Sequence, residues 1–308
     1  MSSLNTNIAA MTALQTLRST NSEMLQTQNR ISTGLRVSSA SDNAAYWSIA
    51  TTMRNDRQSL STVSDALGLG SATAEIAAKG IETAIDIAGQ IKDKLLAART
   101  PGVDRSKIQS EISELQASLS AVVEGASFNG QNWLQTHSTD DSERTIVSSF
   151  SRDSSGNISI GTVTVDLSDT RLVDTDTTAS AAGGILDSDI TITNGSDVTV
   201  LELDISALTD TDEDLTDLED MISGVDAAIE SMTDAASTLG AVKTRIDIQK
   251  DFADSLMSAI DKGVGQLVDA DMNEESTRLQ ALQVRQQLGI QALSIANQSA
   301  QSILSLFR

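Results

Sequence analysis

The chain has 308 residues and a formal charge of −22 at pH 7, from 21 basic and 43 acidic side chains. It contains no cysteine and a single histidine, His137, which excludes disulfides, thiolate zinc sites and paired-histidine metal sites. This charge would repel a phosphate backbone, so we expect no nucleic-acid partner. No stretch approaches 18 apolar residues, and the opening residues lack the pattern of a cleaved secretory signal, so we expect no membrane insertion.

The first arm of the chain has a heptad pattern. A seam with alternating spacings of four and three runs from residue 10 to residue 35; it is apolar except for Asn21 and Gln28, and it is typical of a helix that packs along one side. We take the side chains of this seam as candidates for assembly contacts: Leu14, Leu17, Met24, Ile31 and Leu35. A break at 34–42 precedes a second helical stripe, which runs to the turn Thr100-Pro101-Gly102. Residues 108–122 predict a further helix that returns antiparallel.

The last arm repeats this pattern over residues 225–267 and again after Asp269-Ala270-Asp271. The final helix carries apolar residues on two sides, so a single partner helix would not cover it. One stripe includes Leu279, Leu282, Leu293, Ile303 and Phe307, and the other consists of Val284, Leu288 and Ile295. Exposed seams at both ends of a chain favour adhesion between copies, and head-to-tail copies form open helical filaments.

The middle of the chain differs in charge and in period. Residues 137–220 carry 3 basic and 20 acidic groups, so most of the net charge lies there. Runs rich in Val, Ile and Thr predict short strands at 145–150, 157–167, 189–193 and 197–205, with turn signals between them. We therefore expect a mainly α fold, with long terminal helices and a small acidic antiparallel β-domain inserted between them.

Three features of the sequence resemble a calcium loop, a dinucleotide-binding loop and a metal site, but each is better explained by a structural role or by a place on the surface. The acidic run 210–220 lacks the Gly and Glu of a calcium loop, where it has Leu215 and Met221, and we expect it to cap the following helix. The glycines of 67–71 lack the third glycine of a dinucleotide loop, which favours a packing role. His137 beside two aspartates is a weak metal candidate. We expect no enzyme activity and no cofactor; calcium or ligand binding by the middle region remains an alternative.

Several ordered motifs resemble those of the bacterial flagellins. They lie at 3–8, 29–45, 128–130, 268–271, 293–298 and 303–308, and the similarity covers about residues 1–136 and 221–308. The individual residues that match these family motifs are Asn5, Asn7, Arg30, Gly34, Arg36, Asp42, Phe128, Asn129, Gly130, Asp269, Asp271, Asn297 and Gln298.

The resemblance implies a filament subunit built from three domains. These would be an inner helical domain (1–40 with 270–308), a helical bundle (41–140 with 221–269) and a surface domain (141–220). It also implies a homopolymer, possibly with other flagellins, that is exported unfolded through the flagellar type III apparatus to an extracellular filament beneath a cap. A hook-filament junction protein, which shares the terminal architecture without polymerising indefinitely, is the alternative.

The sequence departs from the family pattern in segments that resemble those read by immune receptors. Tyr46 and Trp47 stand where a small and an aliphatic residue are common, and Asn43 replaces an acid. Asp93 stands where flagellins seen by the animal innate receptor carry an arginine, and a reversed charge at an interface opposes binding. We therefore expect weak or no recognition by innate immune receptors.

Overall fold

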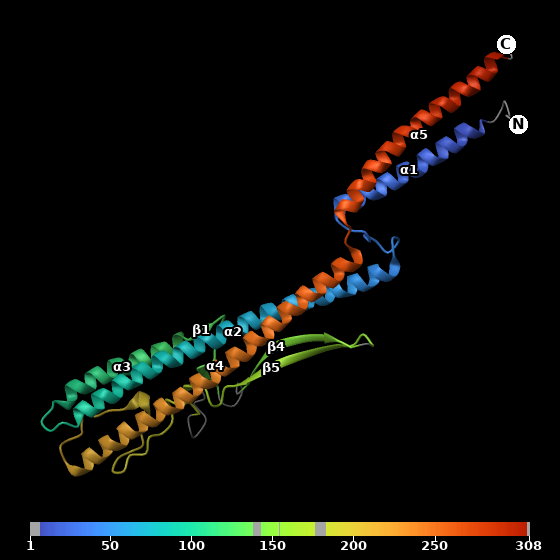
Figure 1. Ribbon diagram of the computed structural model, residues 1–308. Coiled ribbons are helices and arrows are strands. Elements are labelled where there is room, and N and C mark those ends of the chain that lie inside the picture. The colour runs from blue at the N-terminus through green and yellow to red at the C-terminus, as the bar shows by residue number, and fades with distance from the viewer. Residues whose placement is uncertain (1–6, 138–142, 154, 176–182, 307–308) are drawn as a thin grey trace. The chain divides into compact units, whose positions relative to one another are not determined.

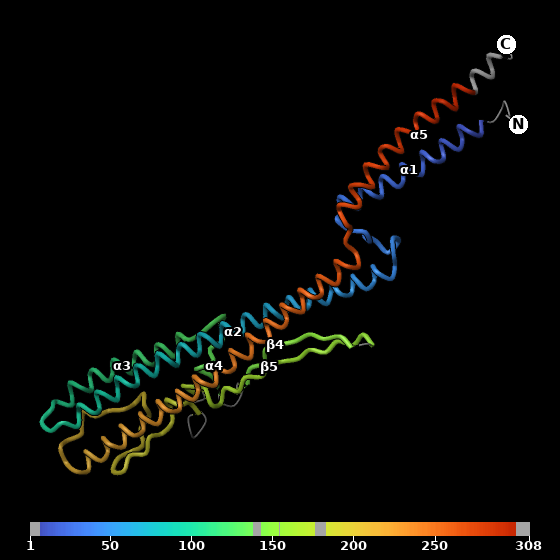
Figure 2. Tube along the Cα trace, viewed as in Figure 1, coloured from blue at the N-terminus to red at the C-terminus, as the bar shows by residue number. Residues whose placement is uncertain are grey.

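The computed structural model describes residues 7–137, 143–153, 155–175 and 183–306, with side chains described as far as residue 299. The expected mainly α class is confirmed. Five helices dominate the described chain, namely α1 (Ile8–Thr33), α2 (Ala44–Ala98), α3 (Arg105–Gly125), α4 (Asp212–Val268) and α5 (Met272–Leu306) (Figure 1). The tube in Figure 2 follows the same order along the chain. No described helix is long and apolar enough to cross a membrane.

The chain divides into two compact units. Unit 1 consists of residues 1–58 and 257–308, and unit 2 of residues 59–256. Both breaks expected from the sequence between an inner domain and a bundle, after residue 40 and before residue 270, fall inside unit 1. By sequence, unit 1 holds 9 basic and 8 acidic groups, whereas unit 2 holds 12 and 35. Unit 1 is therefore nearly neutral, and unit 2 carries the acidity of the protein.

Unit 2 has one continuous hydrophobic core. Helices α2 and α4 are linked across their surfaces by Lys92 and Asp226, whose Nζ and Oδ1 lie 2.8 Å apart. The core gathers side chains of α2, α3 and α4, and it also takes in residues of the middle region, including Leu167, Leu172, Leu186, Leu203 and Ile205. The middle region thus contributes its largest aliphatic side chains to the core of the helices that flank it.

The long strands of the middle region form one hairpin. Strand β4 (Glu143–Arg152) pairs antiparallel with β5 (Ile158–Asp166), as the alternation of 145–150 and 157–167 predicts. Four further segments of two residues each form short strands: β1 (Ser127–Phe128) pairs antiparallel with β2 (Gln131–Asn132), and β3 (Gln135–Thr136) pairs in parallel with β6 (Val173–Asp174). The middle region is therefore small and strand-containing.

The strands predicted at 189–193 and 197–205 are wrong. Ile190 and Val198 make a single β-bridge, and Val200–Glu202 is a short 3₁₀-helix, η1. The reason is a competing set of hydrogen bonds: Gln116 of α3 donates from Nε2 to the carbonyls of Val200 and Leu203, at 3.1 and 3.2 Å. The Val and Ile of these runs are buried against helices instead of against other strands, so alternation alone misassigned them.

The acidic run 210–220 caps α4, as predicted. Asp212, Glu213 and Asp214 lie in the first turn of the helix, where its dipole favours negative charge. The backbone N–H of Asp214 donates to Thr211 Oγ1 at 3.3 Å, and Asp214 Oδ2 in turn accepts the N–H of Thr209 at 2.7 Å. No group of three or more acidic or histidine side chains among the described residues is arranged to hold a metal ion.

Two glycines of α2 provide a matched test of packing in unit 2. A Cβ at Gly80 would lie 2.7 Å from Leu134 Cδ1 and 2.9 Å from Ala126 Cβ, whereas a Cβ at Gly89 would meet nothing within 4 Å. We expect Gly80→Ala to lower the free energy of unfolding by about 1–3 kcal/mol, because it overpacks the core. Gly89→Ala should raise it by up to about 1 kcal/mol, since alanine is the better helix former.

Urea unfolding of both variants, followed by circular dichroism, measures the difference. Equal midpoints for Gly80→Ala and Gly89→Ala would contradict the close approach of α2 to residues 126 and 134.

Candidate assembly surface

The two ends of the chain pair as neighbouring helices in unit 1. Helices α1 and α5 lie side by side (Figure 1). Leu17, Met24 and Ile31 of the predicted seam are half-buried in α1, and Leu279, Leu282 and Leu293 are buried or half-buried in α5. These seam positions are therefore used within one subunit.

The predicted seam of α1 needs two corrections. Leu14 is 39 % exposed, so it does not belong to the covered face. Thr20 and Thr27 do belong to it, with exposed fractions of 6 % and 3 %. Thr20 is accommodated because its hydroxyl donates to the carbonyl of Thr16 at 2.9 Å, which satisfies the buried group inside its own helix.

Asn7 joins the beginning of α1 to α5. It is the N-cap of α1, where its Oδ1 accepts the N–H of Ala10 at 3.0 Å. Its Nδ2 donates to the carbonyl of Ala296 in α5 at 2.9 Å. One side chain thus starts one terminal helix and holds the other, which explains why an asparagine serves this position of the family motif.

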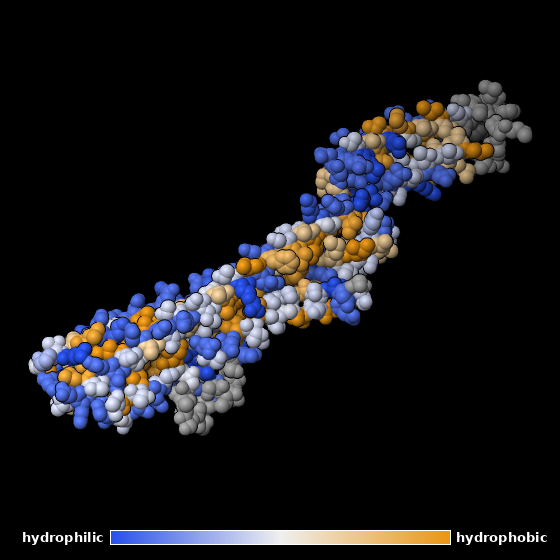
Figure 3. Space-filling model, turned by 60° about the horizontal axis from the view of Figure 1, so that its bottom comes forward, coloured by the Kyte–Doolittle hydropathy of each residue, from blue (hydrophilic) through white to orange (hydrophobic). Residues whose placement is uncertain are grey.

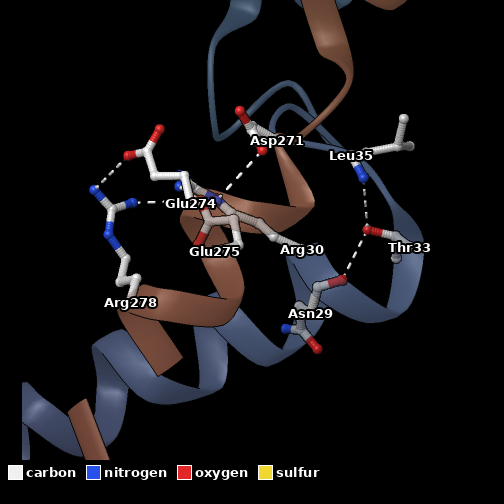
Figure 4. A network of polar contacts seen from close by, with 8 residues as sticks. All are labelled: Asn29, Arg30, Thr33, Leu35, Asp271, Glu274, Glu275 and Arg278. Atoms are coloured by element: carbon white, nitrogen blue, oxygen red, sulfur yellow. Dashed lines mark hydrogen bonds and ion pairs between the residues drawn. The ribbon is translucent and has the colours of Figure 1, made fainter. Parts of the chain in front are cut away.

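Arg30 and Glu275 form a buried ion pair between the same two helices (Figure 4). Arg30 Nη1 lies 2.9 Å from Glu275 Oε1, and Arg278 Nη1 lies 3.3 Å from the same oxygen. Only 6 % of the Glu275 side chain is exposed, and its Oε2 has no hydrogen-bond partner among the described residues. Removing Arg30 would leave the buried Glu275 carboxylate with Arg278 of its own helix as its one remaining ion-pair partner among the described residues, so the pair with Arg30 favours one arrangement of α1 against α5.

The segment that follows α1 and the segment that precedes α5 are joined by backbone hydrogen bonds, which we call the backbone clamp. Gly34 ends α1 in the left-handed conformation, with φ 74°, and its carbonyl accepts the N–H of Ala270 at 2.9 Å. The N–H groups of Arg36 and Val37 both donate to the carbonyl of Val268, at 2.6 and 3.2 Å. Leu35 also forms an antiparallel β-bridge with Asp269. The two connecting segments are therefore hydrogen-bonded to each other.

Both connections then start a new helix from a capping side chain. At the beginning of α5, Asp271 Oδ1 accepts the N–H of Glu274 at 3.3 Å (Figure 4). The same oxygen accepts the N–H of Asn273 at 2.8 Å. Asn43 Oδ1 accepts the N–H groups of Ala45 and Tyr46, both at 3.1 Å, at the beginning of α2. Asn43 therefore keeps the capping function although it is not an acid.

Asp42 organises the turn before α2. Its Oδ2 accepts the backbone N–H groups and the hydroxyls of Ser38 and Ser39, all at 3.0 to 3.1 Å. These hydrogen bonds, with that of the Ser38 hydroxyl first, hold the pKa of Asp42 below its usual range. The turn is therefore tied to an ionised carboxylate.

The motif at 128–130 is a tight hairpin turn in unit 2. Asn129 and Gly130 have φ of 50° and 76°, and they connect β1 to β2 as a two-residue loop, which requires left-handed residues. Asn132, which the sequence analysis did not single out, holds this hairpin to α3 by donating to the carbonyl of Val123 at 2.7 Å. The sequence around Asn132 has no pattern that predicts this hydrogen bond to α3.

A second apolar surface in unit 1 has no cover. Val284, Leu288 and Ile295 of α5 are 55 %, 57 % and 64 % exposed, which confirms that α5 is apolar on two sides. Ile290, Ile8, Met11 and Leu25 are exposed in the same helix pair. The space-filling view shows hydrophobic side chains at the surface of these helices (Figure 3). An uncovered apolar stripe of this kind marks an interaction site.

Some of the residues that the sequence predicts for assembly or for the family motifs lie outside the described part of the structure. Asn5, Phe307 and the side chain of Ile303 lie outside the described residues. Asn297 lies in α5 with an exposed side chain. Helix α5 continues past Ala300 to Leu306.

Comparisons with known proteins match both arms. The bacterial flagellin N-terminal helical region matches residues 4–139, and the bacterial flagellin C-terminal helical region matches residues 222–307. The chain belongs to the bacterial flagellin family.

Full-length relatives agree with this assignment. Flagellin C of Rhizobium meliloti (strain 1021) is 47 % identical over 344 aligned positions, and Flagellin A of the same strain is 42 % identical over 398. The flagellin of Brucella melitensis biotype 1 is 45 % identical over 309. Each alignment covers 100 % of both chains. Flagellins are structural subunits that polymerise into flagellar filaments, and nothing in these matches favours the hook-filament junction protein.

The Arg30–Glu275 pair gives a prediction for the filament. Arg30→Met leaves Glu275 buried with Arg278 alone, so we expect it to weaken the α1–α5 pairing by about 3 kcal/mol per subunit. Filaments of this variant should dissociate at a lower temperature than those of the native chain, as followed by light scattering during heating.

Two further variants control this experiment. Arg30→Met combined with Glu275→Met should recover most of the lost stability, because it also removes the buried carboxylate that has lost its stronger partner. Lys79→Met breaks the exposed pair with Glu82 and should leave the dissociation temperature nearly unchanged, because exposed ion pairs contribute little to stability. If Arg30→Met dissociates no earlier than Lys79→Met, the pair does not hold the helices together.

Proposed function

We propose that copies of this flagellin join through the uncovered face of the α1–α5 pair. The observation that carries the proposal is the apolar stripe of Val284, Leu288 and Ile295, which lies on α5 beside a seam already occupied by α1. Burying each such side chain contributes about 1.5–3 kcal/mol, so a few of them per copy suffice for stable packing. Among the members of the predicted assembly set whose side chains the structure describes, Leu14 and Leu288 are exposed.

Charge supports the same assignment. Unit 1 has a formal charge of +1, from 9 basic and 8 acidic groups, so copies of it approach without net repulsion. Unit 2 has 12 basic and 35 acidic groups, a formal charge of −23, and its copies repel one another unless they are spaced or screened. We infer that residues 1–40 with 270–308 form the inner part of the filament, 41–140 with 221–269 the bundle, and 141–220 its acidic outer surface.

The remaining partners follow from the family. We infer that the chain is exported unfolded by the flagellar type III apparatus, meets the filament cap and the hook-junction proteins, and resides in the extracellular filament, possibly mixed with other flagellins. The role is structural and not enzymatic. A chain without disulfides is compatible with passage in an unfolded state.

Removal of the terminal arms tests the proposal most simply. A version that lacks residues 1–40 and 270–308 loses the α1–α5 pair, and we expect no filaments from it after seeding with filament fragments. The full chain should give long filaments by electron microscopy under the same conditions. Full chains that stop at short rings would overturn the proposal in favour of the junction protein.

A point variant tests the stripe itself. Leu288→Glu places a charge in the proposed contact, and we expect it to prevent elongation, because burying an unpaired carboxylate costs several kcal/mol. Gln283→Glu adds the same charge to the same helix at a polar, exposed position that lies about 140° around the helix axis from Leu288, and it should elongate normally. Normal filaments from Leu288→Glu would exclude the stripe as the assembly surface.

We also propose that innate receptors recognise this flagellin weakly. Asp93 lies exposed on α2 between Lys92, which pairs with Asp226, and Lys94, which pairs with Glu111. Tyr46 and Trp47 likewise present large exposed side chains in the segment that resembles the one read by plant receptors. We expect Asp93→Arg to raise the response of a cell reporter for the animal receptor, and a full response to the native chain would contradict the proposal.

A further inference from the structure

Arg171 of the middle region is a buried cation with an incomplete set of hydrogen bonds. Only 4 % of this residue is exposed. Its Nε donates to the carbonyl of Gly183 at 3.2 Å, whereas its buried Nη1 has no hydrogen-bond partner among the described residues. Burying a charge is costly unless hydrogen bonds and an opposite charge compensate it. The Arg171 guanidinium therefore calls for a partner that the described chain does not supply.

Arg105 of the same unit shows how a buried arginine is fully compensated. It is 7 % exposed, and each of its three nitrogens donates a hydrogen bond. Its Nε and Nη1 donate to the carbonyls of Ala98 and Leu208, at 3.0 and 3.2 Å. Its Nη2 lies 2.7 Å from Asp210 Oδ1, which supplies the opposite charge. Arg171 is as deeply buried, but it lacks the carboxylate and one of these hydrogen bonds.

The carboxylates in the segments around Arg171 bind other groups. Asp166 Oδ1 accepts the N–H and the hydroxyl of Ser168, at 2.9 and 2.6 Å. Asp174 Oδ2 accepts a backbone N–H at 3.2 Å, and Asp187 Oδ2 accepts the N–H of Asp174 at 2.7 Å. The hydrogen bonds from Ser168 and, to a smaller extent, the charge of Arg171 hold the pKa of Asp166 below its usual range. The charge of Arg171 is thus felt by an exposed carboxylate that is already bound to Ser168.

Further unpartnered donors lie in the same part of the fold. In the part of the chain that the structure describes, five buried side-chain atoms have no hydrogen-bond partner, and four of them belong to the segments 133–136 and 170–171. We call these four the donor cluster: Trp133 Nε1, Thr136 Oγ1, Thr170 Oγ1 and Arg171 Nη1. The two segments are joined, since the N–H groups of Leu172 and Val173 both donate to the carbonyl of Leu134, at 2.8 and 3.0 Å. All four atoms can donate a hydrogen bond, and one of them carries positive charge.

We propose that the donor cluster binds a small inorganic anion of the size of chloride, with Arg171 as its charged ligand. Water would satisfy the hydroxyls but would not neutralise the guanidinium, and a cation is repelled by it. Because all four atoms are buried, the site suits a small anion better than a bulky one. The donor cluster lies within unit 2 of one subunit, so this inference does not depend on the proposed assembly surface.

Trp133 reports on this site in the unassembled subunit. Trp47→Phe leaves Trp133 as the only tryptophan, and its exposure of 2 % protects it from quenchers that stay in the solvent. Bromide, a halide that quenches tryptophan on contact, should reduce the Trp133 emission to a plateau, and added chloride should restore the emission by competition. Sodium gluconate, whose anion is bulky, keeps the ionic strength constant, because the charge of −23 on unit 2 responds to salt. Emission that bromide leaves unchanged, or reduces without a plateau, would overturn the proposal.

Urea unfolding, followed by circular dichroism, tests the role of Arg171. The native chain should have a higher midpoint in sodium chloride than in sodium gluconate of the same ionic strength, because an anion that binds only the folded state stabilises it. Arg171→Met should have the same midpoint in both salts. Arg105→Met is the matched control, since it removes a buried arginine that has its own carboxylate; it should lower both midpoints and keep their difference.

Two results of the unfolding experiment would contradict the anion site. One is an equal midpoint of the native chain in the two salts, and the other is a difference between the salts that persists in Arg171→Met. If Arg171→Met does not fold, the bromide titration of Trp47→Phe and the native midpoints decide the question without it.

Discussion

The pairing of the first helix with the last is the constraint on which the rest of this structure depends. It joins segments that are 289 residues apart in sequence where Asn7 binds the carbonyl of Ala296, and 245 apart where Arg30 meets Glu275. Closing such a loop costs chain entropy, which one polar contact does not offset. The seam, the buried ion pair and the backbone clamp after Gly34 together offset it, and this explains why the family motifs cluster at both chain ends.

The same pairing determines which surface remains for other copies. Because α1 occupies one stripe of α5, the stripe of Val284, Leu288 and Ile295 stays more than half exposed in the part of the subunit that the structure describes. Charge favours contacts through one unit over the other. Copies of the nearly neutral unit 1 can pack against one another, whereas copies of the acidic unit 2 repel one another. Adhesive arms and a solvated acidic surface are the two properties that a helical polymer needs.

Periodicity in the sequence predicted the helices well because each is long and has a regular apolar face. The break after Gly34, the turn at Pro101 and the caps at the beginning of α4 follow from local chemistry and were equally predictable. The strand assignment of 189–205 failed because tertiary hydrogen bonds from Gln116 decide that segment. Buried Thr20 and Thr27 were missed because a threonine looks polar in sequence, although a threonine hydroxyl can be satisfied within its own helix, as that of Thr20 is. The sequence did not predict the buried role of Glu275, since its burial depends on Arg30, which is remote in sequence.

A density map of the assembled filament, obtained by electron cryo-microscopy at a resolution that shows side chains, tests the central claim most directly. The account predicts that Leu288 and Ile295 contact a different copy while Leu282 and Leu293 contact α1 of their own chain. A map in which the stripe of Val284, Leu288 and Ile295 faces water, with copies joined only through the acidic unit 2, would contradict it.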